Sequence, residues 1–110
     1  MNKVYVAQEN PRVDIISATK WGELIPLSNF KDQLHLNPGR LVMQLKRKLK
    51  DFDDGDWLLA IGDPAIIGVA FAIASDFNSG RVNILKWDKI ERIYYPVKIS
   101  IRGGIEDINI

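Results

Sequence analysis

The chain has 110 residues, 46% of them hydrophobic and 26% charged, which is the composition of one ordinary globular domain. Fifteen Lys and Arg residues against 14 Asp and Glu residues leave a net charge of +1, so no global field attracts the protein to nucleic acid or anionic lipid. The absence of cysteine excludes disulfides, a thiolate nucleophile and sulfur-ligated metals, and it favours a reducing, cytoplasmic setting.

The first third of the chain predicts two short strands. Lys3 to Gln8 is a run containing Val and Tyr, and it ends in a proline-containing turn. Ser17 to Gly22 resembles one helical turn closed by glycine, and in the extended run Glu23 to Leu27 that follows, Pro26 indicates an edge strand. No apolar segment in the chain is long enough for a signal peptide or a membrane-spanning helix, so we expect no membrane association.

An amphipathic helix is predicted to begin at Asn37-Pro38, which supplies a capping side chain and a proline at the first helical position. Apolar residues recur at helical spacing on one stripe, at Leu41, Val42, Leu45, Leu49 and Phe52. The opposite side is a basic face with an exposed methionine, made by Arg40, Met43, Lys46, Arg47 and Lys50. The acidic turn at residues 53–56 should end this helix.

The middle of the chain predicts a central strand followed directly by a buried helix. Trp57 to Ile61 is apolar without alternation, as in a strand covered on both faces. Gly62 ends the strand, and Asp63-Pro64 then provides the next cap. The helix from Pro64 to Phe77 has no charge before Asp76, so we expect it to be nearly fully buried, with its small residues allowing close approach of neighbouring backbone.

The last third predicts a hairpin from Arg81 to Trp87 and from Ile93 to Ile101. Val97, Ile99 and Ile101 alternate with polar residues, so the second strand should have one dry face, and its proline indicates the edge of the sheet. The predicted fold is therefore a single small α/β domain over residues 1–102. Its mixed sheet has about five strands in the order β-β-α-β-α-β-β, with a parallel centre and a C-terminal hairpin. Residues 103–110 are expected to form a flexible tail.

Two surfaces are candidate binding sites. Gln8, Asn10 and Arg12 follow the first strand, so they should meet Gly62 and Asp63 at the carboxyl edge of the sheet, where α/β proteins hold nucleotides or phosphorylated metabolites. The Asp63 carboxylate argues against a phosphate site, because it repels anions. Its simpler role is to cap the helix. The second candidate is the basic helix face, which could contact an acidic protein surface or phosphates. The alternative without a function is that this face is simply solvated.

No catalytic constellation is visible, and no metal or cofactor is predicted. The acidic turn and the preceding Asp51 form a carboxylate cluster of Asp51, Asp53, Asp54 and Asp56. Its glycine is out of register with a calcium-binding loop, and no bidentate Glu follows. The dispersed tryptophans Trp21, Trp57 and Trp87 are interpreted as core or rim packing.

Over residues 57–101 the chain resembles small uncharacterised proteins of tailed marine phages. The resemblance rests on Ile61-Gly62-Asp63-Pro64, Gly80-Arg81, Leu85-Lys86-Trp87-Asp88 and Tyr94-Tyr95-Pro96-Val97. It implies a phage gene product acting in the host bacterial cytoplasm, and it brings no activity and no site residues.

Taken together, these patterns predict a non-catalytic binding protein that engages a host or viral macromolecule through the basic helix face or an edge strand. A protein partner is expected, nucleic acid remains a lesser alternative, and edge strands would also allow homo-oligomers. The alternative function is a small protein that binds a nucleotide or a phosphorylated metabolite at the carboxyl edge.

Overall fold

A computed structural model of the chain describes residues 2–103, and its helices and strands follow the predicted order. One short 3-10 helix, η1, lies between the first two strands. The elements are β1 (Lys3–Val6), η1 (Ile16–Trp21), β2 (Glu23–Pro26), α1 (Pro38–Leu49), β3 (Trp57–Leu59), α2 (Pro64–Phe77), β4 (Arg81–Asp88) and β5 (Ile93–Ser100).

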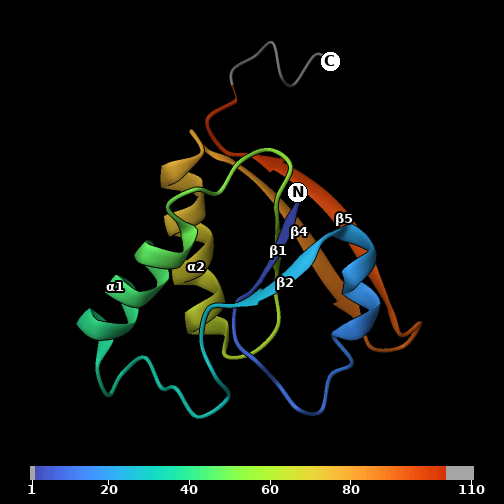
Figure 1. The fold of residues 1–110 in the computed structure, drawn as a ribbon, viewed down its shortest axis with the longest axis horizontal. Coiled ribbons are helices and arrows are strands. Elements are labelled where there is room, and N and C mark those ends of the chain that lie inside the picture. The colour runs from blue at the N-terminus through green and yellow to red at the C-terminus, as the bar shows by residue number, and fades with distance from the viewer. Residues whose placement is uncertain (1, 104–110) are drawn as a thin grey trace.

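The strands form one five-stranded sheet in the order β2-β1-β3-β4-β5. β1 pairs in parallel with both β2 and β3, β3 pairs in parallel with β4, and β5 returns antiparallel to β4. Helices α1 and α2 lie on one side of this sheet and η1 on the other (Figure 1). The predicted parallel centre, central third strand and C-terminal hairpin are thereby confirmed.

Both long helices begin at the predicted caps. The Asn37 side chain accepts a hydrogen bond from the Arg40 backbone N–H at 3.2 Å, and the Asp63 carboxylate accepts one from the Ala65 N–H at 2.9 Å. In each case proline follows at a helix position whose N–H has no intrahelical partner, so its missing donor costs nothing. α1 ends at Leu49, and Phe52 enters the core from the following turn instead of from the helix.

The sheet separates two apolar clusters. On the helix side, Tyr5 and Leu58 are buried against residues of α1 and α2, including Leu45 and Ile66. On the η1 side, Leu59 is buried in a second cluster that contains Val4, Val6, Ala18, Leu85 and Tyr94. Because consecutive residues of β3 enter opposite clusters, this strand is covered on both faces, as its uninterrupted apolar sequence predicts.

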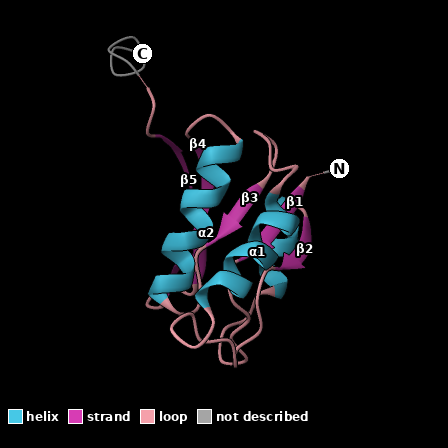
Figure 2. Ribbon diagram, turned by 90° about the vertical axis from the view of Figure 1, so that its left-hand side faces the viewer, coloured by secondary structure: helices cyan, strands magenta, loops and turns pink. Residues whose placement is uncertain are grey.

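The prediction that the second helix is nearly fully buried is wrong. α2 buries only one side, with Ile66, Ala70, Ile73 and Ala74, whereas Ala65, Gly68 and Ala72 are exposed. A side chain added at Gly68 would meet no atom within 4 Å, so this glycine borders open space and admits no neighbouring backbone. The view onto the helix layer shows α2 beside α1, in front of the sheet (Figure 2).

The predicted dry face of the last strand is also wrong. Val97 is 39% exposed and Ile101 60% exposed, and Ile93 and Tyr95 on the same side are exposed as well. The buried residue of β5 is Tyr94, on the opposite face. β5 lies at the edge of the sheet, as its proline predicts, but the helix layer does not extend far enough to cover it.

Of the predicted tail, residues 104–110 lie outside the described residues, and Gly103 is exposed. Within residues 2–103, no helix is both long enough and apolar enough to cross a membrane.

Candidate functional site

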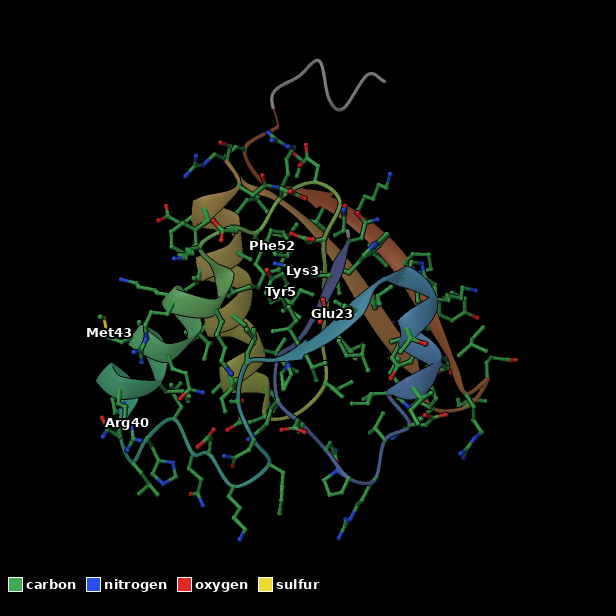
Figure 3. All side chains as sticks on the ribbon, in the orientation of Figure 1. Lys3, Tyr5, Glu23, Arg40, Met43 and Phe52 are labelled. Carbon is green, nitrogen blue, oxygen red and sulfur yellow. The ribbon has the colours of Figure 1, made fainter. Side chains whose placement is uncertain are left out.

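The basic face of α1 has the geometry that its sequence predicts. The side chains of Leu41, Leu45 and Leu49 are buried and anchor the helix. On the other side Arg40, Met43, Lys46, Arg47 and Lys50 are all exposed. Arg40 and Met43 point away from the sheet at the outer margin of the molecule (Figure 3). The face therefore presents four cations around a methionine that is 57% exposed.

No carboxylate of residues 2–103 lies within ion-pair distance of these cations. The ion pairs in this part of the chain join Arg81 to Asp54 at 2.9 Å and Arg102 to Asp76 at 3.6 Å. α1 itself contains no acidic residue. Lys48, on another side of the helix, donates to the Pro26 carbonyl at 2.7 Å, so its ammonium holds the end of β2 and does not join the basic face.

The carboxyl edge of the sheet brings together the second predicted set. Gln8, Asn10, Arg12, Gly62 and Asp63 line one open hollow of about 400 Å³, together with residues that include Phe30. This juxtaposition follows from the parallel pairing of β1 with β3, which places the ends of both strands at one edge.

Gln8 is committed to the fold within that hollow. Its side-chain oxygen accepts from the Asp63 backbone N–H at 2.7 Å, and its amide nitrogen donates to the carbonyls of Asn29 at 3.0 Å and Asp32 at 2.9 Å. We call this arrangement the Gln8 clamp. A side chain at Gly62 would collide with it, because the added Cβ would lie 2.4 Å from the Gln8 Cβ. The clamp and the Asp63 cap occupy N–H groups that a phosphate would need.

The remaining polar groups of the hollow make local bonds. The Asn10 side chain accepts from the Arg12 backbone N–H at 3.0 Å, which is the bond of an Asx turn. The Arg12 side chain is exposed. Arg12 is therefore the cation of this hollow that remains available to a ligand.

The carboxylates of the acidic turn bind protein donors. Asp56 is buried and accepts from the backbone N–H groups of Lys3 and Asp53, both at 3.0 Å. The Asp54 carboxylate accepts from the Arg81 and Asn78 side chains at 2.9 Å, and these bonds lower the pKa of Asp54. Within the described residues, no group of three or more acidic or histidine side chains is placed to hold a metal ion. The turn ties the N-terminus of β1 to β4.

The aromatic residues expected at core or rim positions form one connected group on the η1 side. The Trp21 ring packs against Trp57 and Tyr94, with centroids 6.4 Å apart in each pair, and Trp87 lies 4.7 Å from Tyr94. The Tyr94 hydroxyl donates to the Asp14 carbonyl at 2.8 Å. Burial and the nearby Asp14 charge raise the pKa of Tyr94 to about 12.

The sequence interpretation missed one surface, the exposed apolar side of β5. It consists of the exposed residues Ile93, Tyr95 and Val97, the half-buried Ile99, and the exposed Ile101 just after the strand. The period-two pattern identifies this side of the strand but predicts that it is the dry face. The signal that it faces outward is that residues 2–103 contain no third long helix to cover it.

The fold and these surfaces define a small α/β protein that presents a basic helix face, a polar hollow and an open apolar strand. A family model described as Phage Pam3 gp32-like protein matches residues 2–101, and the chain therefore belongs to this family of phage proteins. The predicted resemblance to phage proteins is confirmed, and it extends to the first half of the chain. Neither the curated proteins nor the solved structures include a match.

Proposed function

We propose that this phage protein is a non-catalytic binding protein that docks an acidic protein surface through the basic face of α1. The observation that carries the proposal is the group of four exposed cations around Met43, without an ion-pair partner in residues 2–103. A complementary acidic surface would supply the missing counter-charges. Because the chain belongs to a family of phage proteins, we expect this partner to be a host or phage macromolecule.

The residue types favour a protein partner over nucleic acid. Met and Arg are enriched at protein interfaces, where a central apolar contact surrounded by polar residues excludes water. Met43 holds that central place on α1. A nucleic-acid backbone is instead bound mainly by a broad positive field, and the whole chain has a net charge of only +1.

The helix dipole offers a purely structural reason for part of this charge. Lys46 and Arg47 lie in the last turn of α1, where a cation stabilises a helix by about 0.3–1 kcal/mol. The dipole does not account for Arg40, which lies in the first turn of the helix, where a cation is unfavourable. The experiment must therefore separate lost binding from lost stability.

Reversing the charge of the basic face should remove the partner. The variant Lys46→Glu/Arg47→Glu/Lys50→Glu and the wild type serve as baits in a nuclease-treated lysate of infected host cells, with quantitative mass spectrometry of what they retain. We expect at least a tenfold loss of an acidic protein, because three attractive contacts become repulsive.

The matched control is Lys31→Glu/Lys86→Glu/Lys89→Glu, which makes the same change in net charge at exposed lysines elsewhere. It should retain the partner, and thermal melts should show that both variants are folded. If the α1 variant keeps every partner, or if both variants lose the same proteins equally, the basic face is not the docking surface.

The hollow at the carboxyl edge supports a second candidate, the binding of a nucleotide or a phosphorylated metabolite. The observation in its favour is the exposed Arg12 beside a hollow of about 400 Å³, which is within the size range of small-molecule sites. It ranks second because the Gln8 clamp and Asp63 occupy helix N–H groups. A nucleotide panel that raises the melting temperature of the wild type, but not of Arg12→Ala, would reverse this order.

A further inference from the structure

The two edges of the sheet differ in how far they are protected. At β2, the Lys48 ammonium donates to the Pro26 carbonyl, and the Gln44 side-chain amide donates to the Leu27 carbonyl at 2.6 Å. α1 thus covers the end of this four-residue strand. β5 is twice as long, with eight residues, and no helix or loop hydrogen bond to its outer edge occurs in residues 2–103. β5 is therefore the open edge.

The hydrogen-bond pattern shows which backbone groups of β5 point outward. The Ile101 N–H donates to the Gly80 carbonyl at 2.9 Å, so residues at odd positions exchange bonds with β4. The even positions, from Tyr94 to Ser100, direct their backbone groups away from the sheet. Pro96 stands at one of them, where its missing N–H leaves the β4 ladder intact.

The side chains at odd positions of β5 are apolar and lie on the same face of the sheet as the helices. They include Tyr95 and Val97, which are 43% and 39% exposed. Their neighbours on β4 are partly covered by α2, as shown by Val82, which is buried in the helix-side cluster. Burying such a strip would remove apolar surface from water at about 25 cal/mol per Å².

We propose that β5 pairs antiparallel with β5 of a second copy of this chain, with the twofold axis at Val97. This register gives the following opposed pairs between the two copies: Val97 with Val97, Tyr95 with Ile99, Ile93 with Ile101, Pro96 with Lys98, and Tyr94 with Ser100. Every apolar residue of the exposed strip then faces an apolar residue. The Lys98 N–H of each copy donates to the Pro96 carbonyl of the other.

Charge and backbone chemistry select this register among its neighbours. Residues whose backbone groups point outward must pair with each other across the interface. The register can therefore shift only in steps that keep even-numbered residues opposite even-numbered residues. One step in one direction would place Lys98 opposite Lys98, and like charges directly opposed are destabilising. One step in the other direction would place Pro96 opposite Pro96, where neither residue can donate. Of these three registers, only the one about Val97 avoids both an opposed Lys98 pair and an opposed Pro96 pair.

The twofold axis would make the sheet continuous across both copies. Antiparallel neighbours in one sheet keep their corresponding faces on the same side, so both helix layers would flank the paired strands. Dimerisation would also cover the edge that is otherwise open to pairing with other chains. The interface is separate from the basic face of α1, so the dimer and the proposed function can be tested independently.

Single cysteines test the register directly, because the chain has none of its own. Val97 and its symmetry mate would form a non-hydrogen-bonded pair with Cα atoms about 4.5 Å apart, which a disulfide can bridge. We expect Val97→Cys to form a covalent dimer under mild oxidation. Tyr95→Cys, on the same face with similar exposure, should not, because its symmetry mate would lie four residues along the partner strand. Gln33→Cys, on an exposed loop, controls for random collision.

A backbone variant tests the hydrogen bonds. Ser100→Pro removes an outward N–H without touching the β4 ladder, and Pro96 already shows that β5 accepts proline at such a position. Sedimentation analysis should give twice the monomer mass for the wild type and for Ser100→Ala, and at least a tenfold weaker dimer for Ser100→Pro. A wild type that stays monomeric at 100 μM, or a dimer in which neither Val97→Cys nor Ser100→Pro has its expected effect, overturns the proposal.

Discussion

Replacing Gln8 with Ala is expected to lower the free energy of unfolding by about 2–4 kcal/mol, although Gln8 belongs to no hydrophobic cluster. The side chain is only 6% exposed and makes three hydrogen bonds, each to a backbone group. The bonds join the end of β1 to the start of α2 and to the loop before α1. Alanine would leave these backbone groups without their partner, at about 1–3 kcal/mol for each group that stays buried.

Urea unfolding, followed by tryptophan fluorescence, would measure this loss. Gln33→Ala is the matched control, because Gln33 is exposed and makes no side-chain hydrogen bond in residues 2–103; its effect should stay within about 0.5 kcal/mol. Gln8→Glu separates the two kinds of bond. The glutamate side chain keeps an acceptor for the Asp63 N–H. When it is ionised, it has no hydrogen to donate to the carbonyls of Asn29 and Asp32. If Gln8→Ala cost less than 1 kcal/mol, the clamp would not be a major support of the fold.

The Gln8 clamp also shows where sequence reasoning reached its limit. Parallel topology predicted that Gln8, Asn10, Arg12, Gly62 and Asp63 would gather at one edge, and they do. The hydrogen-bond partners of Gln8 lie 21, 24 and 55 positions further along the chain, so no local sequence pattern predicts them. A polar residue after a strand has the same appearance in sequence whether it binds a ligand or the protein itself.

The helix starts could be predicted because their determinants are local. Asn37 with Pro38 and Asp63 with Pro64 act on N–H groups two or three residues away. Burial is not local, and two predictions of burial are wrong, that of α2 and that of one face of β5. Ala65, Gly68 and Ala72 carry no charge, so they match a buried helix, yet whether any element lies over them depends on packing alone. The odd positions of β5 are a second example, because their apolar pattern matches a buried face although most of them are exposed.

The basic face of α1 could be located for the opposite reason. Helical spacing alone places Arg40, Met43, Lys46, Arg47 and Lys50 on one side, opposite the buried leucines. Spacing did not show that Lys48 is held by β2, because that bond spans 22 positions. The residues of a helix face can thus be predicted from sequence, whereas their counter-charges require the fold.

Stability is expected to fall as the pH rises above 10, by roughly 2–3 kcal/mol between pH 9 and pH 11. Burial raises the pKa of Tyr5 to about 12, helped by the Asp56 charge, and burial likewise raises the pKa of Tyr94 to about 12. In the unfolded chain a tyrosine ionises near pH 10. The folded state therefore keeps two protons that the unfolded state loses, and each group lowers stability by about 1.4 kcal/mol per pH unit in this range.

The sign of this effect follows from the raised pKa values. Well below pH 10 both tyrosines are neutral in the folded and the unfolded state, and their contribution to the free energy of unfolding is fully present. It is lost as the pH rises from 10 towards 12, after which the folded state ionises too. Lysines titrate in the same range, so the comparison must be between variants. Tyr94→Phe cannot ionise at this position and should show a shallower fall.

Tyr94→Phe should also be less stable at pH 7, by about 1 kcal/mol, because it loses the hydrogen bond to the Asp14 carbonyl. The two stability curves should therefore approach each other as the pH rises, and this convergence is a result that simple loss of packing does not produce. Urea unfolding at pH 7, 9, 10 and 11, with tyrosinate absorbance recorded at each pH, provides both measurements. Parallel curves would mean that the Tyr94 hydroxyl ionises as readily in the folded protein as in the unfolded chain.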